Sequence, residues 1–141
     1  MELEKEEDIQ LDAERPDITV LVVDDEEPLR KLCKEILESA KYQVITAQNG
    51  NEAINIYELK KDSINLVLLD MIMPDLSGHE TLRRLRAISP KVKVLISSGF
   101  SREIEIKWAE EKGIAGFIEK PYRYKSLLKK IKHALKSELS N

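Results

Sequence analysis

The chain has 141 residues, which is enough for one domain of ordinary size and too few for two well-filled cores. Hydrophobic residues make up 42% and charged residues 35% of the sequence, with a net charge of -3, a profile that excludes disordered and fibrous proteins. The longest apolar runs, such as 20–23 and 66–69, fall far short of the roughly 18 residues of a membrane-spanning helix, so we expect no membrane contact.

The first 17 residues are acidic, and Lys5 and Arg15 are their only basic side chains. They contain no apolar stretch of the kind that a secretory signal requires. Such a segment cannot bury enough apolar surface to offset the entropy that it would lose on ordering. We therefore predict an acidic, flexible leader or linker over residues 1–17 and a folded domain over residues 18–139.

From residue 18 onward, short apolar runs alternate with longer segments in which apolar residues recur at helical spacing. The predicted strands span residues 18–23, 43–47, 65–69, 92–97 and 116–119, and the predicted helices span residues 28–40, 51–60, 78–88, 101–112 and 125–139. Regular alternation of strand and helix predicts an α/β fold with a parallel sheet and right-handed crossovers. The expected architecture is a doubly wound, flavodoxin-like five-stranded sheet of order 2-1-3-4-5 with five helices on its two faces.

Polar side chains follow four of the predicted strands. Asp24 and Asp25 come after the first strand, Asp70 after the third, Ser98 after the fourth and Lys120 after the fifth. In doubly wound sheets, ligands bind at the carboxyl ends of the strands where the winding reverses, here between strands 1 and 3. Three clustered carboxylates coexist as anions only beside a cation, and oxygen-only ligands select a hard ion such as Mg²⁺. A carboxylate beside a metal, a lysine and a hydroxyl can accept a phosphoryl group, and Asp70 is the candidate nucleophile.

Four stretches that contain these residues resemble the signature motifs of response regulator receiver domains, the CheY-like family. They are Val22-Val23-Asp24-Asp25-Glu26, Leu68-Leu69-Asp70-Met71-Ile72-Met73-Pro74-Asp75-Leu76-Ser77-Gly78, Ile96-Ser97-Ser98-Gly99 and Phe117-Ile118-Glu119-Lys120-Pro121. The resemblance covers residues 18–139, and the last two stretches look most similar to the receivers of hybrid sensor histidine kinases.

The resemblance implies a signalling switch of a two-component phosphorelay, in which Asp70 accepts a phosphoryl group from a histidine kinase or a histidine phosphotransfer protein. It also implies that Asp24, Asp25 and Asp70 hold Mg²⁺ together with the backbone carbonyl of Ile72. The apolar side chain of Ile72 cannot align an attacking water molecule, so we predict a phosphorylated state that is longer-lived than with Asn at this position.

The same resemblance gives roles to three further residues. Lys120 corresponds to the lysine of the family's site, and its bond to the following proline is expected to be cis. Ser98 corresponds to the switch hydroxyl; Ser97 is the alternative, but the small residue Gly99 favours Ser98, because the family places such a residue directly after the hydroxyl. Phe117 corresponds to the aromatic residue that turns inward as the hydroxyl moves toward the phosphoryl group.

Other side chains have both a structural and a functional interpretation. His79 and His133 lack companion ligands at metal-binding spacing, and we predict that both face solvent. Cys33, the only cysteine, is predicted to be a core residue, and the resulting lack of any internal disulfide is consistent with a cytoplasmic location. The lysines of residues 120–136 are predicted to form the solvated face of a helix rather than a nucleic-acid site, because no arginine or aromatic cluster accompanies them.

A possible partner surface lies on the helix predicted over residues 101–112, where Ile104 and Trp108 share one stripe. In one interpretation, Trp108 folds over the helix and covers core residues. In the other, Ile104, Trp108 and Tyr122 form an exposed apolar surface for a partner, together with Tyr124.

These observations favour a regulatory phosphoacceptor over an enzyme that acts on metabolites. The alternative is a magnesium-dependent phosphohydrolase that works through an aspartyl phosphate, although haloacid-dehalogenase-like enzymes typically have Asp-x-Asp-x-Thr after the first strand, where this sequence has Asp24 and Asp25 side by side. A third possibility is a scaffold that keeps only the fold. The sequence is compatible with a stand-alone regulator and with a receiver of a hybrid histidine kinase, and the similarity of the motifs favours the latter.

Overall fold

A computed structural model describes residues 17–99, 107, 110 and 112–136 of this chain. The elements within these residues are β1 (Thr19–Val23), α2 (Glu27–Ser39), β2 (Gln43–Ala47), α3 (Gly50–Lys60), β3 (Ile64–Asp70), α4 (Gly78–Ile88), β4 (Val94–Ser98), β5 (Gly116–Glu119) and α6 (Tyr124–Lys136). The described part thus has four of the five predicted helices. The helix predicted over residues 101–112 lies mostly outside the described residues, and Lys107 and Glu110, which are described, have helical backbone.

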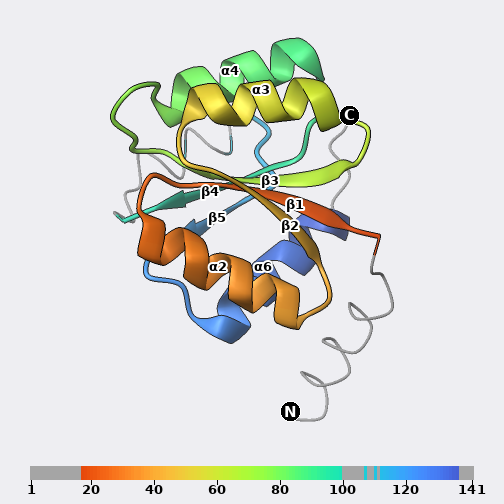
Figure 1. Cartoon of the computed structure of the whole chain (residues 1–141), viewed down its shortest axis with the longest axis vertical. Helices are drawn as coiled ribbons and strands as arrows, with labels where there is room; N and C mark the ends of the chain where they lie inside the picture. The colour runs from red at the N-terminus through yellow and green to blue at the C-terminus, as the bar shows by residue number, and fades with distance from the viewer. Residues whose placement is uncertain (1–16, 100–106, 108–109, 111, 137–141) are drawn as a thin grey trace.

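The five strands form one parallel sheet of order β2-β1-β3-β4-β5. The helices α2 and α6 cover one face of the sheet, and α3 and α4 cover the other (Figure 1). The predicted flavodoxin-like fold is therefore confirmed. The carboxyl ends of all strands share one edge, and the winding reverses between β1 and β3. Among the helices that the structure describes, none has the length and apolar character that crossing a membrane requires.

Two separate cores form because alternate residues of each strand point to opposite faces of the sheet. The core beneath α2 and α6 includes Val20, Val22, Leu66, Leu68 and Leu95. The core beneath α3 and α4 includes Leu21, Val23, Val67, Leu69 and Ile96. Central strands that are covered on both faces have no polar side, which explains why β1 reads as a continuous apolar run rather than an alternating one.

Two strands end one residue later than the sequence pattern predicts. The strand β3 continues to Asp70, which pairs with Ser97 of β4, and β4 continues to Ser98, which pairs with Glu119 of β5. Asp70 and Ser98 are therefore held by the sheet itself and do not belong to the loops that follow it. Groups on such regular elements are positioned more rigidly than groups on loops.

The helices α3 and α2 begin in different ways. At the start of α3, Oδ1 of Asn49 accepts the backbone N–H of Glu52 at 2.8 Å, and Oε1 of Glu52 accepts the backbone N–H of Gln48 at 2.8 Å. This reciprocal pair satisfies N–H groups that have no partner within the helix. The helix α2 has Pro28 in its first turn instead, and the side chain of Glu26, its N-cap residue, makes no such hydrogen bond.

Candidate functional site

Three carboxylates meet at the carboxyl edge of the sheet, where β1 and β3 are neighbours. Asp24 and Asp25 follow β1, and Asp70 is the last residue of β3. One oxygen of each carboxylate lies within 4.8 Å of the others; Asp24 and Asp70 are buried, and Asp25 is exposed. The strand order thus brings together the acidic residues that the sequence indicates as metal ligands.

Lys120 enters the same cluster from the end of β5. Its Nζ lies 2.9 Å from Oδ2 of Asp24 and 3.1 Å from Oδ2 of Asp70. Its backbone N–H donates to the carbonyl of Ser98 at 2.8 Å, and its bond to Pro121 is cis, as the resemblance implies. Burial lowers the pKa of Lys120, but its contacts with Asp24 and Asp70 raise the pKa by more, so the amine is protonated.

The environment of Asp70 raises the pKa of its carboxyl group to about 6. Burial is the main cause and the charge of Asp24 adds to it, while Lys120 and the backbone N–H of Ile72 act in the opposite direction. That N–H donates to Oδ1 of Asp70 at 3.2 Å. The carboxylate is ionised at neutral pH but incompletely stabilised, which suits it to act as a nucleophile.

Two residues that the sequence analysis did not single out hold the loop after β1. The backbone N–H of Glu26 donates to Oδ1 of Asp24 at 2.9 Å, and Nη1 of Arg30 donates to the Asp24 carbonyl at 2.7 Å. Oε1 of Glu26 also lies 3.3 Å from Nζ of Lys120. The available signal was the position of Glu26 at the start of α2, where Ser, Thr, Asp or Asn is the usual capping residue.

The loop after Asp70 turns so tightly that α4 begins beside it. The backbone N–H of Gly78 donates to the carbonyl of Met71 at 3.0 Å. A Cβ atom on Gly78 would lie 2.6 Å from Cα of Met71 and 2.8 Å from the carbonyl oxygen of Asp70, so a side chain does not fit here. Ile72, in the same loop, is 55% exposed and presents an apolar side chain to solvent next to the acceptor.

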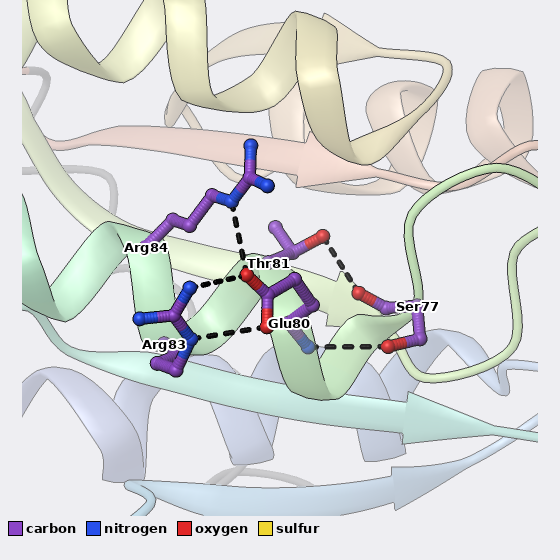
Figure 2. A network of polar contacts seen from close by, with 5 residues as sticks. All are labelled: Ser77, Glu80, Thr81, Arg83 and Arg84. Atoms are coloured by element: carbon purple, nitrogen blue, oxygen red, sulfur yellow. Dashed lines mark hydrogen bonds and ion pairs between the residues drawn. The ribbon is translucent and has the colours of Figure 1, made fainter.

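A polar network fixes the far end of this loop at the start of α4 (Figure 2). Oγ of Ser77 accepts the backbone N–H of Glu80 at 3.1 Å, and Oγ1 of Thr81 donates to the Ser77 carbonyl at 2.8 Å. The Glu80 carboxylate pairs with Arg83 and Arg84, and their hydrogen bonds lower the pKa of Glu80 to about 2. This network was not predicted from the sequence, although Ser-x-x-Glu before a helix is a recognised capping pattern.

The strand β4 ends in two buried serines, which alternation places on opposite faces of the sheet. Ser97 follows Leu95 on the face beneath α2 and α6, and Ser98 follows Ile96 on the other face, where the half-buried ring of Phe117 packs. Ser98 and Phe117 therefore share a face, as the switch pair of the resemblance requires. Their switch role stays a prediction.

The predicted partner surface needs one correction. The prediction that Tyr122 is exposed is wrong, because this residue is 8% exposed and belongs to the core beneath α2 and α6. Burial raises the pKa of its phenol, and an aromatic ring next to a core gains more from burial than from contact with water. Tyr124 is exposed, with its hydroxyl 3.1 Å from Oγ of Ser39. Ile104 and Trp108 lie outside the described residues.

The predictions for the histidines and the cysteine are confirmed. His79 and His133 are both exposed on helices. Cys33 is fully buried, and burial raises the pKa of its thiol to about 12. Because the thiolate is the reactive form of cysteine, Cys33 is a core residue and not a nucleophile.

The amino-acid sequence of this chain is similar to the sequences of known proteins. The model of a family described as the response regulator receiver domain matches residues 20–132. The chain is 30% identical over 122 residues to a cyclic di-GMP phosphodiesterase of Thermotoga maritima, a match that covers 86% of this chain and 32% of that protein. It is 32% identical over 120 residues to the chemotaxis protein CheY of Listeria monocytogenes, covering 84% of this chain and 99% of that protein. The chain thus spans about a third of the first relative and nearly all of the second.

Solved structures have the same fold. A chain of the CheX-CheY-BeF3-Mg²⁺ complex from Borrelia burgdorferi is 30% identical, with a TM-score of 0.78 over 81% of this chain and 86% of that chain. The receiver domain of the hybrid histidine kinase CckA is 29% identical, with a TM-score of 0.70 over 84% of this chain and 99% of that chain.

Proposed function

Because this chain belongs to the response regulator receiver domain family, we propose that it is a phosphorylation-operated switch of a two-component phosphorelay. The phosphoryl donor is a phosphohistidine of a histidine kinase or of a histidine phosphotransfer protein, and the acceptor is Asp70. The observation that carries the proposal is the position of Lys120, whose Nζ lies 2.9 Å from Asp24 and 3.1 Å from Asp70. It places a fixed cation beside a nucleophilic carboxylate, as phosphoryl transfer requires.

The transfer exchanges one bond to phosphorus for another. A carboxylate oxygen of Asp70 attacks the phosphorus atom and forms the new phosphorus–oxygen bond. The phosphorus–nitrogen bond of the phosphohistidine breaks, and its electron pair returns to the imidazole. The ammonium group of Lys120 binds a phosphoryl oxygen and balances the added negative charge. The product is an aspartyl phosphate at the end of β3.

The three carboxylates fit Mg²⁺. They offer only oxygen donors, which lie within 4.8 Å of one another, and Lys120 alone does not balance their charge. Asp24, Asp25 and Asp70 would hold the ion together with the backbone carbonyl of Ile72. When bound, Mg²⁺ neutralises charge on the phosphoryl oxygens. The presence of Mg²⁺ in the Borrelia CheX-CheY complex supports the extension to this chain.

A phosphoryl group on Asp70 changes the protein surface next to β4 and β5, because it moves side chains on these two strands. The hydroxyl of Ser98 donates to a phosphoryl oxygen, and the space that it leaves accommodates the ring of Phe117, which lies on the same face of the sheet. This shifts an existing equilibrium between two arrangements of these strands and the segments that follow them. The partner surface that includes Ile104 and Trp108 stays a prediction.

We further propose the bounds of the domain, its location in the cell and the kind of protein that contains it. We place the receiver at residues 18–139, after an acidic leader or linker, in the cytoplasm. It acts as a stand-alone regulator or as part of a hybrid histidine kinase, and in either setting its own chemistry is limited to gaining and losing the phosphoryl group.

Incubation with acetyl phosphate and Mg²⁺ tests this function. The wild-type chain should gain one phosphoryl group, seen by intact-mass measurement, and Asp70→Asn should gain none. Repeated release of phosphate from phosphate esters would instead identify a phosphohydrolase, and the absence of any label would leave a scaffold that keeps only the fold.

A further inference from the structure

The side chain of Glu26 turns away from the helix that it begins and contacts Lys120. Glu26 is the N-cap residue of α2, but its carboxylate accepts no capping hydrogen bond. Oε1 lies 3.3 Å from Nζ of Lys120 instead, and the Glu26 side chain is 58% exposed. The helix thus lacks a stabilising cap, and the carboxylate lies where solvent meets the buried site.

The ammonium group of Lys120 pairs with three carboxylates in this structure. Asp24, Asp70 and Glu26 place their oxygens 2.9, 3.1 and 3.3 Å from Nζ. An incoming phosphoryl oxygen therefore competes with these three carboxylates for one cation.

Glu26 is the partner whose departure is least unfavourable. The side chains of Asp24 and Asp70 are 2% and 3% exposed, and a backbone N–H also holds each of them. A buried carboxylate that loses its cation is left away from water, which is strongly destabilising. The exposed carboxylate of Glu26 becomes hydrated when it leaves, and exposed ion pairs contribute little to stability.

We propose that Glu26 is a positioning residue that holds Lys120 in the unphosphorylated protein and is displaced by the incoming phosphoryl group. This inference rests on the proposed function, because it needs a phosphoryl group on Asp70. The Glu26 carboxylate competes with the phosphoryl group for Lys120 and repels its negative charge. The same carboxylate adds negative charge beside the metal-binding residues. It therefore weakens the binding of a phosphoryl group and strengthens the binding of a divalent cation.

The test compares Glu26→Gln with Glu27→Gln in the full chain. Both variants remove one negative charge from the start of α2, but Glu27 is 64% exposed and pairs with Lys31 at 3.5 Å, and it makes no ion pair with Lys120 within the described part of the chain. Calorimetric titration measures the affinity for Mg²⁺ alone. A second titration at saturating Mg²⁺ measures the affinity for beryllofluoride, which stands in for the phosphoryl group.

In Glu26→Gln, we expect Mg²⁺ to bind about two- to five-fold more weakly and beryllofluoride to bind about two- to five-fold more tightly. Glu27→Gln should change both affinities by less. Changes of opposite sign in the two affinities support the role of Glu26, because a distorted site would bind both ligands more weakly. Changes of the same sign, no change, or equal changes in Glu27→Gln overturn that role. If the wild-type chain itself binds no beryllofluoride with Mg²⁺, the proposed function fails and the role of Glu26 fails with it.

Discussion

Nζ of Lys120 lies 3.1 Å from Oδ2 of Asp70, and the two side chains are 8% and 3% exposed. The contact joins the end of β5 to the end of β3 across the intervening strand β4. A single buried cation does not balance both Asp70 and its neighbour Asp24. The site without a metal therefore carries surplus negative charge, which a divalent cation relieves.

Burial, together with the negative charge of Asp24, makes ionised Asp70 destabilising. Its pKa is raised from 3.8 to about 6 in the folded protein, so between these values the folded protein binds a proton more strongly than the unfolded chain does. The free energy of unfolding therefore falls as the pH rises through this window. Because Asn is neutral at every pH, we expect Asp70→Asn to raise the free energy of unfolding by about 1 to 3 kcal/mol at pH 7 without divalent cations.

Urea unfolding followed by circular dichroism at pH 4 and pH 7 measures the effect of Asp70→Asn. The gain in stability should be small at pH 4, where the wild-type carboxyl is already neutral in the folded protein. Mg²⁺ should reduce the gain at pH 7, because the ion binds the wild-type folded state more tightly. A variant that is no more stable than the wild type at pH 7 would contradict this account of Asp70.

Asp25 is the exposed member of the carboxylate cluster, and its replacement tests the metal site with little effect on the core. Asp25→Asn removes one charged ligand, so we expect the affinity for Mg²⁺ to fall by about ten-fold or more. Asp75→Asn is the matched control, since Asp75 is also exposed but lies outside the cluster. Calorimetric titration with Mg²⁺ compares the two variants, and equal losses of affinity would argue against a site at Asp25.

Gly78 lies against the backbone of the acceptor loop. A Cβ atom there would lie 2.6 Å from Cα of Met71, so Gly78→Ala must displace that backbone and Asp70 with it. We expect a loss of about 1 to 3 kcal/mol in the free energy of unfolding, as for other overpacked sites, and slower labelling by acetyl phosphate. Gly99→Ala is the control, because its Cβ atom would have no neighbour within 4 Å among the residues that the structure describes. Similar losses in both variants would show that the close approach at Gly78 is not the cause.

We expect the exposed side chain of Ile72 to govern how long the phosphoryl group persists. An amide at this position can hydrogen-bond a water molecule and align it for attack on the aspartyl phosphate, whereas an isoleucine cannot. We expect Ile72→Asn to shorten the lifetime of the phosphorylated state by about ten-fold. This change in rate is smaller than the roughly 100-fold or more that a general base usually contributes. The decay of the label after removal of acetyl phosphate measures this, and an unchanged decay rate would count against the prediction.

The meeting of the acidic residues with Lys120 could be predicted from the sequence for one physical reason. Carboxyl ends of parallel strands share an edge, so the polar residues after successive apolar runs must converge there. This is enough to bring Asp24, Asp70 and Lys120 together. The choice of Ser98 over Ser97 also has support in the alternation of side chains along β4.

The remaining features depend on side-chain conformation and not on element order. The contact between Glu26 and Lys120 requires specific rotamers of two long side chains, which no sequence period specifies. The burial of Tyr122 depends on how the chain turns between β5 and α6, and an aromatic residue after a strand is compatible with either outcome. Such contacts become visible only when the packing of α2 and α6 is known.

The most direct test of the phosphoacceptor assignment is the location of the phosphoryl group after labelling with phosphoramidate and Mg²⁺, a donor whose phosphorus–nitrogen bond resembles that of phosphohistidine. Rapid digestion and peptide mapping by mass spectrometry should place the group on Asp70. A phosphoryl group on His79, on His133 or on another residue, or undiminished labelling of Asp70→Asn, would contradict the account.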